Sequence, residues 1–287
     1  MNNPLLPLVS VCVQTYQHGH YIKECLDSIL MQQTSFPFEI VLGEDESTDV
    51  TREICMEYAK KYPDTIRLFL RSRKDVIYIN GNPTGRFNMM ENLKAAKGKY
   101  IALCEGDDYW TDPLKLQKQV DFLEQHDEYS RSFHDTLFVD ETSADINSRL
   151  WREYEKNHYN LEDTISTVAL FHTSSFIFRV SSLSLPDWFV KVQSADMALF
   201  TLIASRGFLY RLPETMSVYR KNSGGLTKKI NQVDYHRNRI YLFQQINLFL
   251  QGEGQQKIES IIGFHKQELD KLEDKGFLKK IKSFFNK

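Results

Sequence analysis

Two short acidic segments each follow a run of apolar residues in the first 110 positions of the chain. One is residues 43–49 (GEDESTD) and the other is residues 105–110 (EGDDYW). Carboxylates that converge repel one another and need a cation or hydrogen-bond donors to compensate them. Mg²⁺ and Mn²⁺ often bind one or two carboxylates together with phosphate oxygens of a substrate. The two segments therefore indicate a divalent-metal site for a phosphate-bearing ligand.

Asp107 and Asp108 are the strongest acidic candidates, because they are adjacent at the end of an expected strand and precede two aromatic residues. Tyr109 and Trp110 fit two roles equally, either stacking on a sugar or base or packing in the core. His172 also lies near an apolar stretch. There we expect a packed, hydrogen-bonded side chain rather than a catalytic one.

The elements that must position these acids alternate in the first third of the chain. Four short apolar runs have the length and content of buried strands: residues 8–13, 38–42, 66–70 and 100–104. Helical apolar spacing separates them, which predicts βαβ units in a doubly wound, mostly parallel α/β sheet flanked by helices. Ligands of such sheets bind beyond the carboxyl ends of the strands. A site is therefore expected in the loops that follow Val13, Leu42 and Cys104.

The rest of the chain is less regular from about residue 131. Residues 171–180 resemble a strand, residues 195–206 a helix and residues 208–219 an extended segment. From about residue 233 the pattern is helical, with a short break at residues 251–254 (QGEG). We therefore expect one large domain with a helical C-terminal extension.

Several motifs occur in the order that is typical of a known family. As they stand here they are VSVCVQTYQ, FEIVLGEDESTD, GKYIALCEGDDYWTDPLKL, SADMALF and VYRKNSGGLT. They resemble the inverting glycosyltransferase family 2, whose common pattern runs from VSVIIPTYN through DDGSTD and DADD to a later acidic residue and a YRxH-type segment. The resemblance covers residues 8–227. It implies a GT-A catalytic domain over residues 1–230, followed by the helical extension over residues 231–287.

The resemblance also implies which residues bind the nucleotide-sugar donor. Thr15 and Tyr16 would lie beside the base, and Asp45 would bind base and ribose groups. Asp108 would be the closer ligand of Mn²⁺ or Mg²⁺, and Asp107 would assist at the ribose or diphosphate.

The later motifs imply the chemistry. Asp196 falls where the family places its general base, although an acid in the first turn of a helix can simply interact with the helix dipole. Arg220 and Lys221 lie in the segment that can close near the diphosphate. An inverting transfer is a single displacement, so it needs a base opposite the leaving group and charge compensation for the departing phosphate.

Some positions depart from the family pattern. Glu44 and Glu46 flank Asp45 where the family has Asp and Gly. Glu105 replaces the first Asp of DADD, and Asn222 stands where His is frequent. The QxxRW segment of processive synthases does not occur in the sequence. We therefore expect transfer of a single sugar.

The predicted activity is a metal-dependent transfer from a nucleotide-diphosphate sugar, with a UDP-sugar favoured, onto an acceptor hydroxyl. The resemblance implies hexosyl or N-acetylhexosaminyl transfer in surface polysaccharide or glycan assembly, with a glycan or lipid-linked acceptor. A nucleotidyltransferase is the first alternative, but the N-terminus lacks the glycine-rich phosphate loop with a basic residue. A non-catalytic scaffold that binds nucleotide sugars is the second.

The overall composition excludes other classes. The 287-residue chain has a net charge of −2, so nothing attracts the whole chain to nucleic acid. Its four cysteines are widely separated and are expected to be buried, reduced thiols. The N-terminus lacks the segments of a signal peptide, and no apolar run approaches the roughly 20 residues that span a bilayer. We therefore expect a cytoplasmic protein.

The C-terminal segment differs from the rest of the chain in charge. Residues 275–287 (KGFLKKIKSFFNK) contain five lysines and no acid, with apolar residues at helical spacing beside them. Such a helix suits reversible binding to an anionic membrane surface, where a lipid-linked acceptor would be found. The alternatives are a helix packed on the catalytic domain and a solvated tail.

Overall fold

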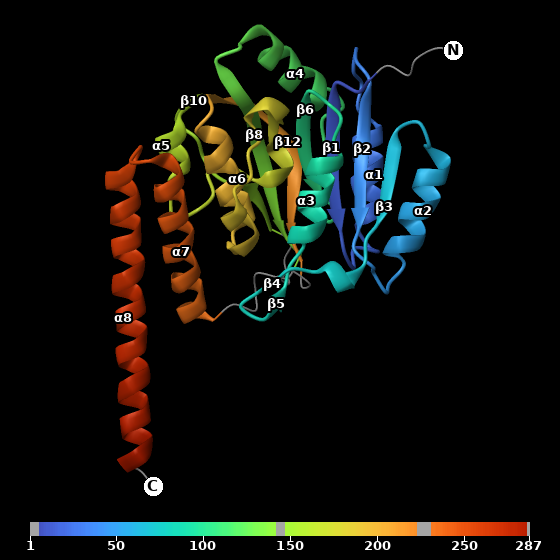
Figure 1. The fold of residues 1–287 in the computed structure, drawn as a ribbon. Coiled ribbons are helices and arrows are strands. Elements are labelled where there is room, and N and C mark those ends of the chain that lie inside the picture. Colours follow the sequence, from blue (N-terminus) through green and yellow to red (C-terminus); the bar gives the residue numbers. More distant parts are fainter. Residues whose placement is uncertain (1–5, 142–146, 223–230, 286–287) are drawn as a thin grey trace.

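A mixed, mostly parallel sheet forms the centre of the protein (Figure 1). The computed structural model describes residues 6–141, 147–222 and 231–285, with side chains as far as Glu273. In order across the sheet, the strands are β10 (His158–Tyr159), β12 (Phe208–Lys221), β8 (Tyr129–Asp140), β11 (Ile177–Arg179), β6 (Tyr100–Glu105), β1 (Val9–Thr15), β2 (Phe38–Glu44) and β3 (Ile66–Leu70). Two short strands pair with the sheet outside this order, β7 (Tyr109–Trp110) with β12 and β9 (Asn147–Leu150) with β8.

The strands β6, β1, β2 and β3 are parallel, as the alternating pattern predicts. Their registers align the strand ends, with Gln14 opposite Glu105 and Thr15 opposite Glu44. Because parallel strands end at the same edge, both acidic segments meet there. The predicted fold class is confirmed.

Helices cover both faces of this sheet (Figure 1), so its strands can be apolar on both sides. One face carries Val11 and Val13 and is covered by α1 (Ile22–Leu30), α2 (Thr51–Lys61) and α4 (Lys115–Gln125). The other carries Cys12 and Leu103 and packs against α6 (Ala195–Ala204), with α3 (Arg86–Ala95) at its margin. The four cysteines are buried free thiols, as expected.

The second half of the sheet differs from the expected pattern. Only Ile177–Arg179 of the predicted strand at 171–180 is a strand (β11), and it runs antiparallel to β6 and β8. Thr173–Ser175 form a 3₁₀ turn instead, because the side chain of His172 accepts a hydrogen bond from the backbone N–H of Ser174. This turn carries His172 toward the acidic strand ends.

Two helices follow, α7 (Gln232–Leu250) and α8 (Gln255–Phe285), and α8 extends past the body of the protein (Figure 1). The break between them falls at the predicted QGEG segment, where Gln251, Gly252 and Gly254 adopt positive φ. Apolar side chains of both helices share a core with α6. The division of the chain at residue 230 stays a prediction.

No helix in the described ranges is both long and apolar enough to cross a membrane. The side chains of the basic C-terminal segment, residues 275–287, lie outside the described residues. Membrane binding through this segment therefore also stays a prediction.

Candidate active site

Arg73 contacts both Tyr16 and Asp45 beyond the ends of β1 and β2. The buried carboxylate of Asp45 accepts a hydrogen bond of 2.6 Å from Arg73, whose guanidinium lies 4.1 Å from the centre of the Tyr16 ring. The other oxygen of Asp45, Oδ1, is buried without a hydrogen-bond partner among the described residues. Burial raises the pKa of Asp45 despite the opposing effect of Arg73. Arg73 lies in a short 3₁₀ turn (Arg73–Asp75) after β3. It belongs to no sequence motif, so it was not among the residues predicted for the site.

The ends of β1 and β6 approach closely at Thr15. A Cβ atom on Gly106 would lie 2.6 Å from Oγ1 of Thr15 and 2.8 Å from Nδ1 of His18. Only glycine therefore fits between Glu105 and Asp107 without a shift of these neighbours. Oγ1 of Thr15 is itself buried and has no partner in the described part of the chain.

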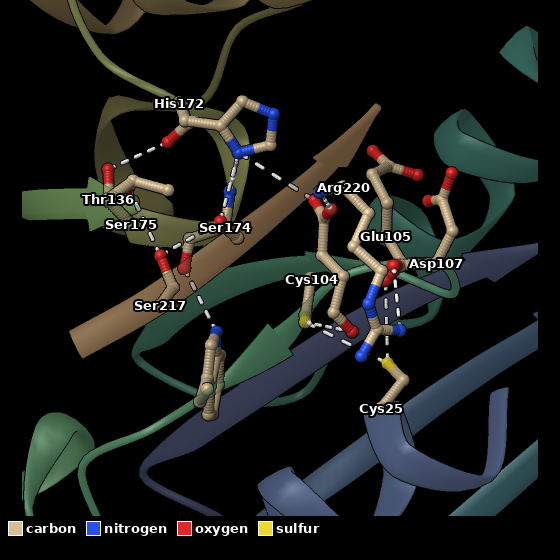
Figure 2. Close-up of polar contacts among 12 residues, drawn as sticks. Cys25, Cys104, Glu105, Asp107, Thr136, His172, Ser174, Ser175, Ser217 and Arg220 are labelled. Atoms are coloured by element: carbon tan, nitrogen blue, oxygen red, sulfur yellow. Dashed lines mark hydrogen bonds and ion pairs between the residues drawn. The ribbon is translucent and has the colours of Figure 1, made fainter. Parts of the chain in front are cut away.

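Glu105 and Asp107 lie together at the end of β6, and their carboxylates point the same way in Figure 2. Desolvation raises the pKa of Glu105 to about 8, and the nearby charges of Asp107 and Asp196 add to this shift. Burial thus disfavours the charged form of Glu105, and the neighbouring acids disfavour it further. The arrangement would be relieved by a cation.

The two adjacent aspartates face different surroundings. Asp108 is 1% exposed, its Oδ1 accepts a hydrogen bond of 3.1 Å from the backbone N–H of Arg220, and its Oδ2 lies 3.7 Å from Nδ1 of His172. Burial lowers the pKa of His172 to about 3, so this histidine is neutral at ordinary pH. The side chain of Asp107 is 21% exposed, and its Oδ2 accepts a 2.9 Å hydrogen bond from Asn222. Asp107 is therefore the more accessible acid.

His172 belongs to a network of polar side chains that includes Ser174 and Ser217 (Figure 2). Its Nδ1 lies 2.9 Å from the hydroxyl of Ser174, which donates to Ser217 in β12. The ring also stacks on Tyr219, with 4.1 Å between ring centres. These contacts fit the packed role expected for this histidine. Trp110 is likewise buried, and its indole N–H donates to the carbonyl of Ser174.

The two basic residues at the end of β12, Arg220 and Lys221, are engaged by acids. Arg220 contacts the carboxylates of Glu24 and Glu141, packs on the Tyr109 ring and donates a 3.3 Å hydrogen bond to the carbonyl of Asp107. This last contact brings Arg220 beside the acidic segment. Lys221 instead forms a 2.6 Å ion pair with Asp140 of β8.

A cavity of about 580 Å³ opens beside Glu105. Its inner end contains Gln14, Glu105 and Asp196, which come from β1, β6 and the first turn of α6. Its outer end is lined by the hairpin of β4 (Tyr78–Ile79) and β5 (Asn82–Pro83) and by α7. The cavity thus brings the predicted base to the acidic strand ends.

Arg86 holds the segment that leads into α6. It is buried and donates hydrogen bonds to the carbonyls of Phe189, Val192 and Gln193. Burial lowers the pKa of Arg86 to about 10, an effect that the charge of Asp196 opposes. Arg86 is therefore a positioning residue for Asp196. Arg86 belongs to no recognisable sequence motif, so it was not among the predicted site residues.

The acids suit a metal ion that completes its coordination with substrate. Among the described residues, no three or more His, Cys, Asp or Glu side chains are grouped to hold a metal ion. Mg²⁺ and Mn²⁺ can bind one or two carboxylates and take their other ligands from water and phosphate. Glu105 and the accessible Asp107 are the acids at the end of β6 that could bind such a cation.

Comparison with known proteins identifies the class. The family model "Glycosyl transferase family 2" matches residues 10–184, and the chain belongs to this family. An uncharacterized protein of Mycobacterium tuberculosis strain H37Rv, Rv1520, is 36% identical over 222 residues, which cover 76% of this chain and 60% of that protein. The chain therefore spans less than two thirds of the length of this relative.

Two solved structures share the fold. TarS of S. aureus (residues 1–349, in complex with UDP-GlcNAc) has a TM-score of 0.60 and 20% identity, covering 83% of this chain and 66% of that one. The mannosyltransferase PcManGT of Pyrobaculum calidifontis, in complex with GDP-Man and Mn²⁺, has a TM-score of 0.57 and 16% identity, covering 92% of this chain and 75% of that one. The GT-A fold expected from the sequence is confirmed.

Proposed function

We propose that the protein is an inverting, metal-dependent glycosyltransferase that moves one sugar from a UDP-sugar to an acceptor hydroxyl. The observation that carries the proposal is the cavity in which Glu105 and Asp196 meet, next to the arrangement of Tyr16, Asp45 and Arg73. A nucleotide sugar that lies across the strand ends would have its base near Tyr16 and its sugar in the cavity. Family membership supports the same reaction.

The nucleoside would stack on the layer formed by Tyr16 and Arg73. The unpartnered Oδ1 of Asp45 is a hydrogen-bond acceptor, which matches the N3–H of uracil and not the bare N3 of cytosine. UDP-GlcNAc in TarS supports a UDP-sugar, while GDP-Man in PcManGT shows that the fold also accepts guanine. Thr15 would complete the pocket from the adjacent position on β1.

We assign the metal contact to Asp107, which differs from the role that the family resemblance implies for Asp108. One oxygen of Asp108 is already committed to the backbone of β12, and the side chain is buried, whereas Asp107 is accessible. When bound there, Mn²⁺ or Mg²⁺ would neutralise the diphosphate and act as a Lewis acid toward the leaving group. Asp108 then positions Arg220 by accepting its N–H.

Asp196 is our proposed general base. Its carboxylate would take the proton of the acceptor hydroxyl as the oxygen forms a bond to the anomeric carbon. The bond from that carbon to the phosphate oxygen breaks in the same step, and the nucleotide leaves with the electron pair. A single displacement inverts the anomeric configuration. Arg220 donates to the carbonyl of Asp107 and is therefore our candidate for compensating the leaving diphosphate, in exchange for its contacts with Glu24 and Glu141.

The acceptor would enter through the outer end of the cavity. Tyr235, Asn238 and Arg239 of α7 line this end, so the C-terminal extension would take part in acceptor binding. We expect a glycan or lipid-linked acceptor in surface polysaccharide or glycan assembly, in keeping with the family resemblance.

Thermal unfolding with a panel of nucleotide sugars tests this proposal. A ligand at 100 times its Kd stabilises the folded state by about 2.7 kcal/mol, so a UDP-sugar with Mn²⁺ should raise Tm measurably. The shift should fall when Mn²⁺ is replaced by EDTA and in the variant Arg73→Gln. If no nucleotide sugar in the panel changes the Tm of the protein, the proposed function is contradicted.

A further inference from the structure

Gln14 is a buried polar residue without a hydrogen-bond partner for its side chain. It precedes Thr15 at the end of β1 and is 7% exposed. Both Nε2 and Oε1 of its carboxamide lack a partner among the described residues. Burying an amide without hydrogen bonds is costly, and natural proteins rarely do so without a reason. A donor and an acceptor are thus free to bind a ligand.

The position of Gln14 indicates which part of a ligand it would meet. Gln14 lines the 580 Å³ cavity together with Glu105 and Asp196, and its carboxamide is buried beside them. Gln14 and Glu105 are register partners on neighbouring parallel strands, so their side chains lie on the same face of the sheet. Tyr16, on which the nucleoside would stack, is only two residues further along the chain. Gln14 therefore lies between the base-binding end and the proposed general base, where the transferred sugar must be.

The residue type at this position differs from the common family pattern. In the pattern VSVIIPTYN the corresponding residue is proline, whereas this chain has VSVCVQTYQ. Proline has no side-chain donor or acceptor. A buried carboxamide in its place adds a group that can recognise polar substituents.

We propose that the carboxamide of Gln14 determines donor specificity by hydrogen bonding to a hydroxyl or acetamido substituent of the transferred sugar. The proposal rests on the proposed glycosyltransferase function. A carboxamide donates through Nε2 and accepts through Oε1, which matches one hydroxyl group or the N–H and C=O of an acetamido group. A donor sugar without the matching group leaves the Gln14 carboxamide buried and unpaired. Sites of this kind strongly favour the sugar that forms the hydrogen bonds over the one that cannot.

The test compares wild type with Gln14→Met, a substitution of similar volume that removes both hydrogen-bonding atoms. Hydrolysis of UDP-glucose, UDP-galactose, UDP-GlcNAc and UDP-GalNAc would be followed with Mn²⁺ present, because water serves as acceptor. We expect the ratio of kcat/KM between the best donor and at least one of the other three to fall at least tenfold in Gln14→Met, with the Kd for UDP unchanged; loss against the C4 epimer indicates a hydroxyl contact, and loss against the sugar without the acetamido group indicates an acetamido contact. Gln33→Met, at an exposed position, is the matched control and should keep the wild-type ratio.

Two results would overturn the role of Gln14. One is an unchanged ratio in Gln14→Met, and the other is an equal loss in Gln33→Met. A second variant, Gln14→Glu, keeps an acceptor and removes the donor, so it should also alter the ratio, and it provides the measurement if Gln14→Met does not fold. A wild-type protein that neither binds UDP nor hydrolyses any donor would instead overturn the proposed function, and the role of Gln14 with it.

Discussion

Glu105 makes the stability of the metal-free protein depend on pH in a way that one substitution should remove. Its pKa is raised from an ordinary 4.5 to about 8. Between these two values the unfolded chain has lost the proton while the folded protein retains it. The free energy of unfolding therefore falls as pH rises, by about 1.4 kcal/mol for each pH unit. The full effect of this shift is on the order of 5 kcal/mol, complete above pH 8.

Glu105→Gln removes this titration and keeps the shape of the side chain. Relative to wild type, the variant should gain at least about 2 kcal/mol in free energy of unfolding between pH 5 and pH 8.5, measured by urea denaturation in EDTA. Glu57→Gln, on the exposed side of α2, controls for the loss of a carboxylate and should show no such gain. Mn²⁺ should stabilise wild type more than Glu105→Gln at pH 8.5. Parallel pH profiles for wild type and Glu105→Gln would refute the reasoning.

Three further predictions concern the metal, the acceptor and the C-terminus. Asp107→Asn should weaken Mn²⁺-dependent UDP binding at least tenfold, measured by calorimetry, whereas Asp108→Asn should mainly lower Tm. A larger loss of Mn²⁺-dependent UDP binding in Asp108→Asn than in Asp107→Asn would assign the metal contact to Asp108. Arg239→Gln should raise KM for a saccharide acceptor several-fold without changing donor hydrolysis, because it lines the outer cavity, while Arg237→Gln, on the same helix and paired with Glu273, should not. Similar KM values for all three proteins would remove α7 from the acceptor site. Truncation after Asp274 should abolish sedimentation with anionic liposomes at low salt, and equal sedimentation of both proteins would exclude the membrane role.

The sequence was informative where local pattern and burial agree. The four parallel strands are mostly apolar because helices cover both faces of this part of the sheet, so their runs stand out, and the predicted strand at 66–70 matches β3. Strand-end positions then place Asp45 and Asp107 near one edge by topology alone. Asp196 lies in the first turn of α6 and lines the same cavity as Glu105, so only the family resemblance, and no strand pattern, indicated it.

Other features depend on contacts between distant segments. The first part of β8 carries buried polar side chains, among them Arg131 and His134, so its sequence resembles an exposed loop. Arg73 reaches Asp45 and Tyr16 from a turn without any motif. The different surroundings of Asp107 and Asp108 come from β12, more than 100 positions away, because the N–H of Arg220 holds Asp108. None of these contacts has a short-range signal in the sequence.

The anomeric configuration of the first product tests the central claim most directly. Hydrolysis of α-linked UDP-GlcNAc with Mn²⁺ would be followed by proton NMR, fast enough to observe the free sugar before mutarotation. Inversion with Asp196 as base predicts that the β-anomer appears first and that Asp196→Asn slows its appearance at least 100-fold while still binding UDP. Appearance of the α-anomer first, or a wild-type rate in Asp196→Asn, would contradict the account.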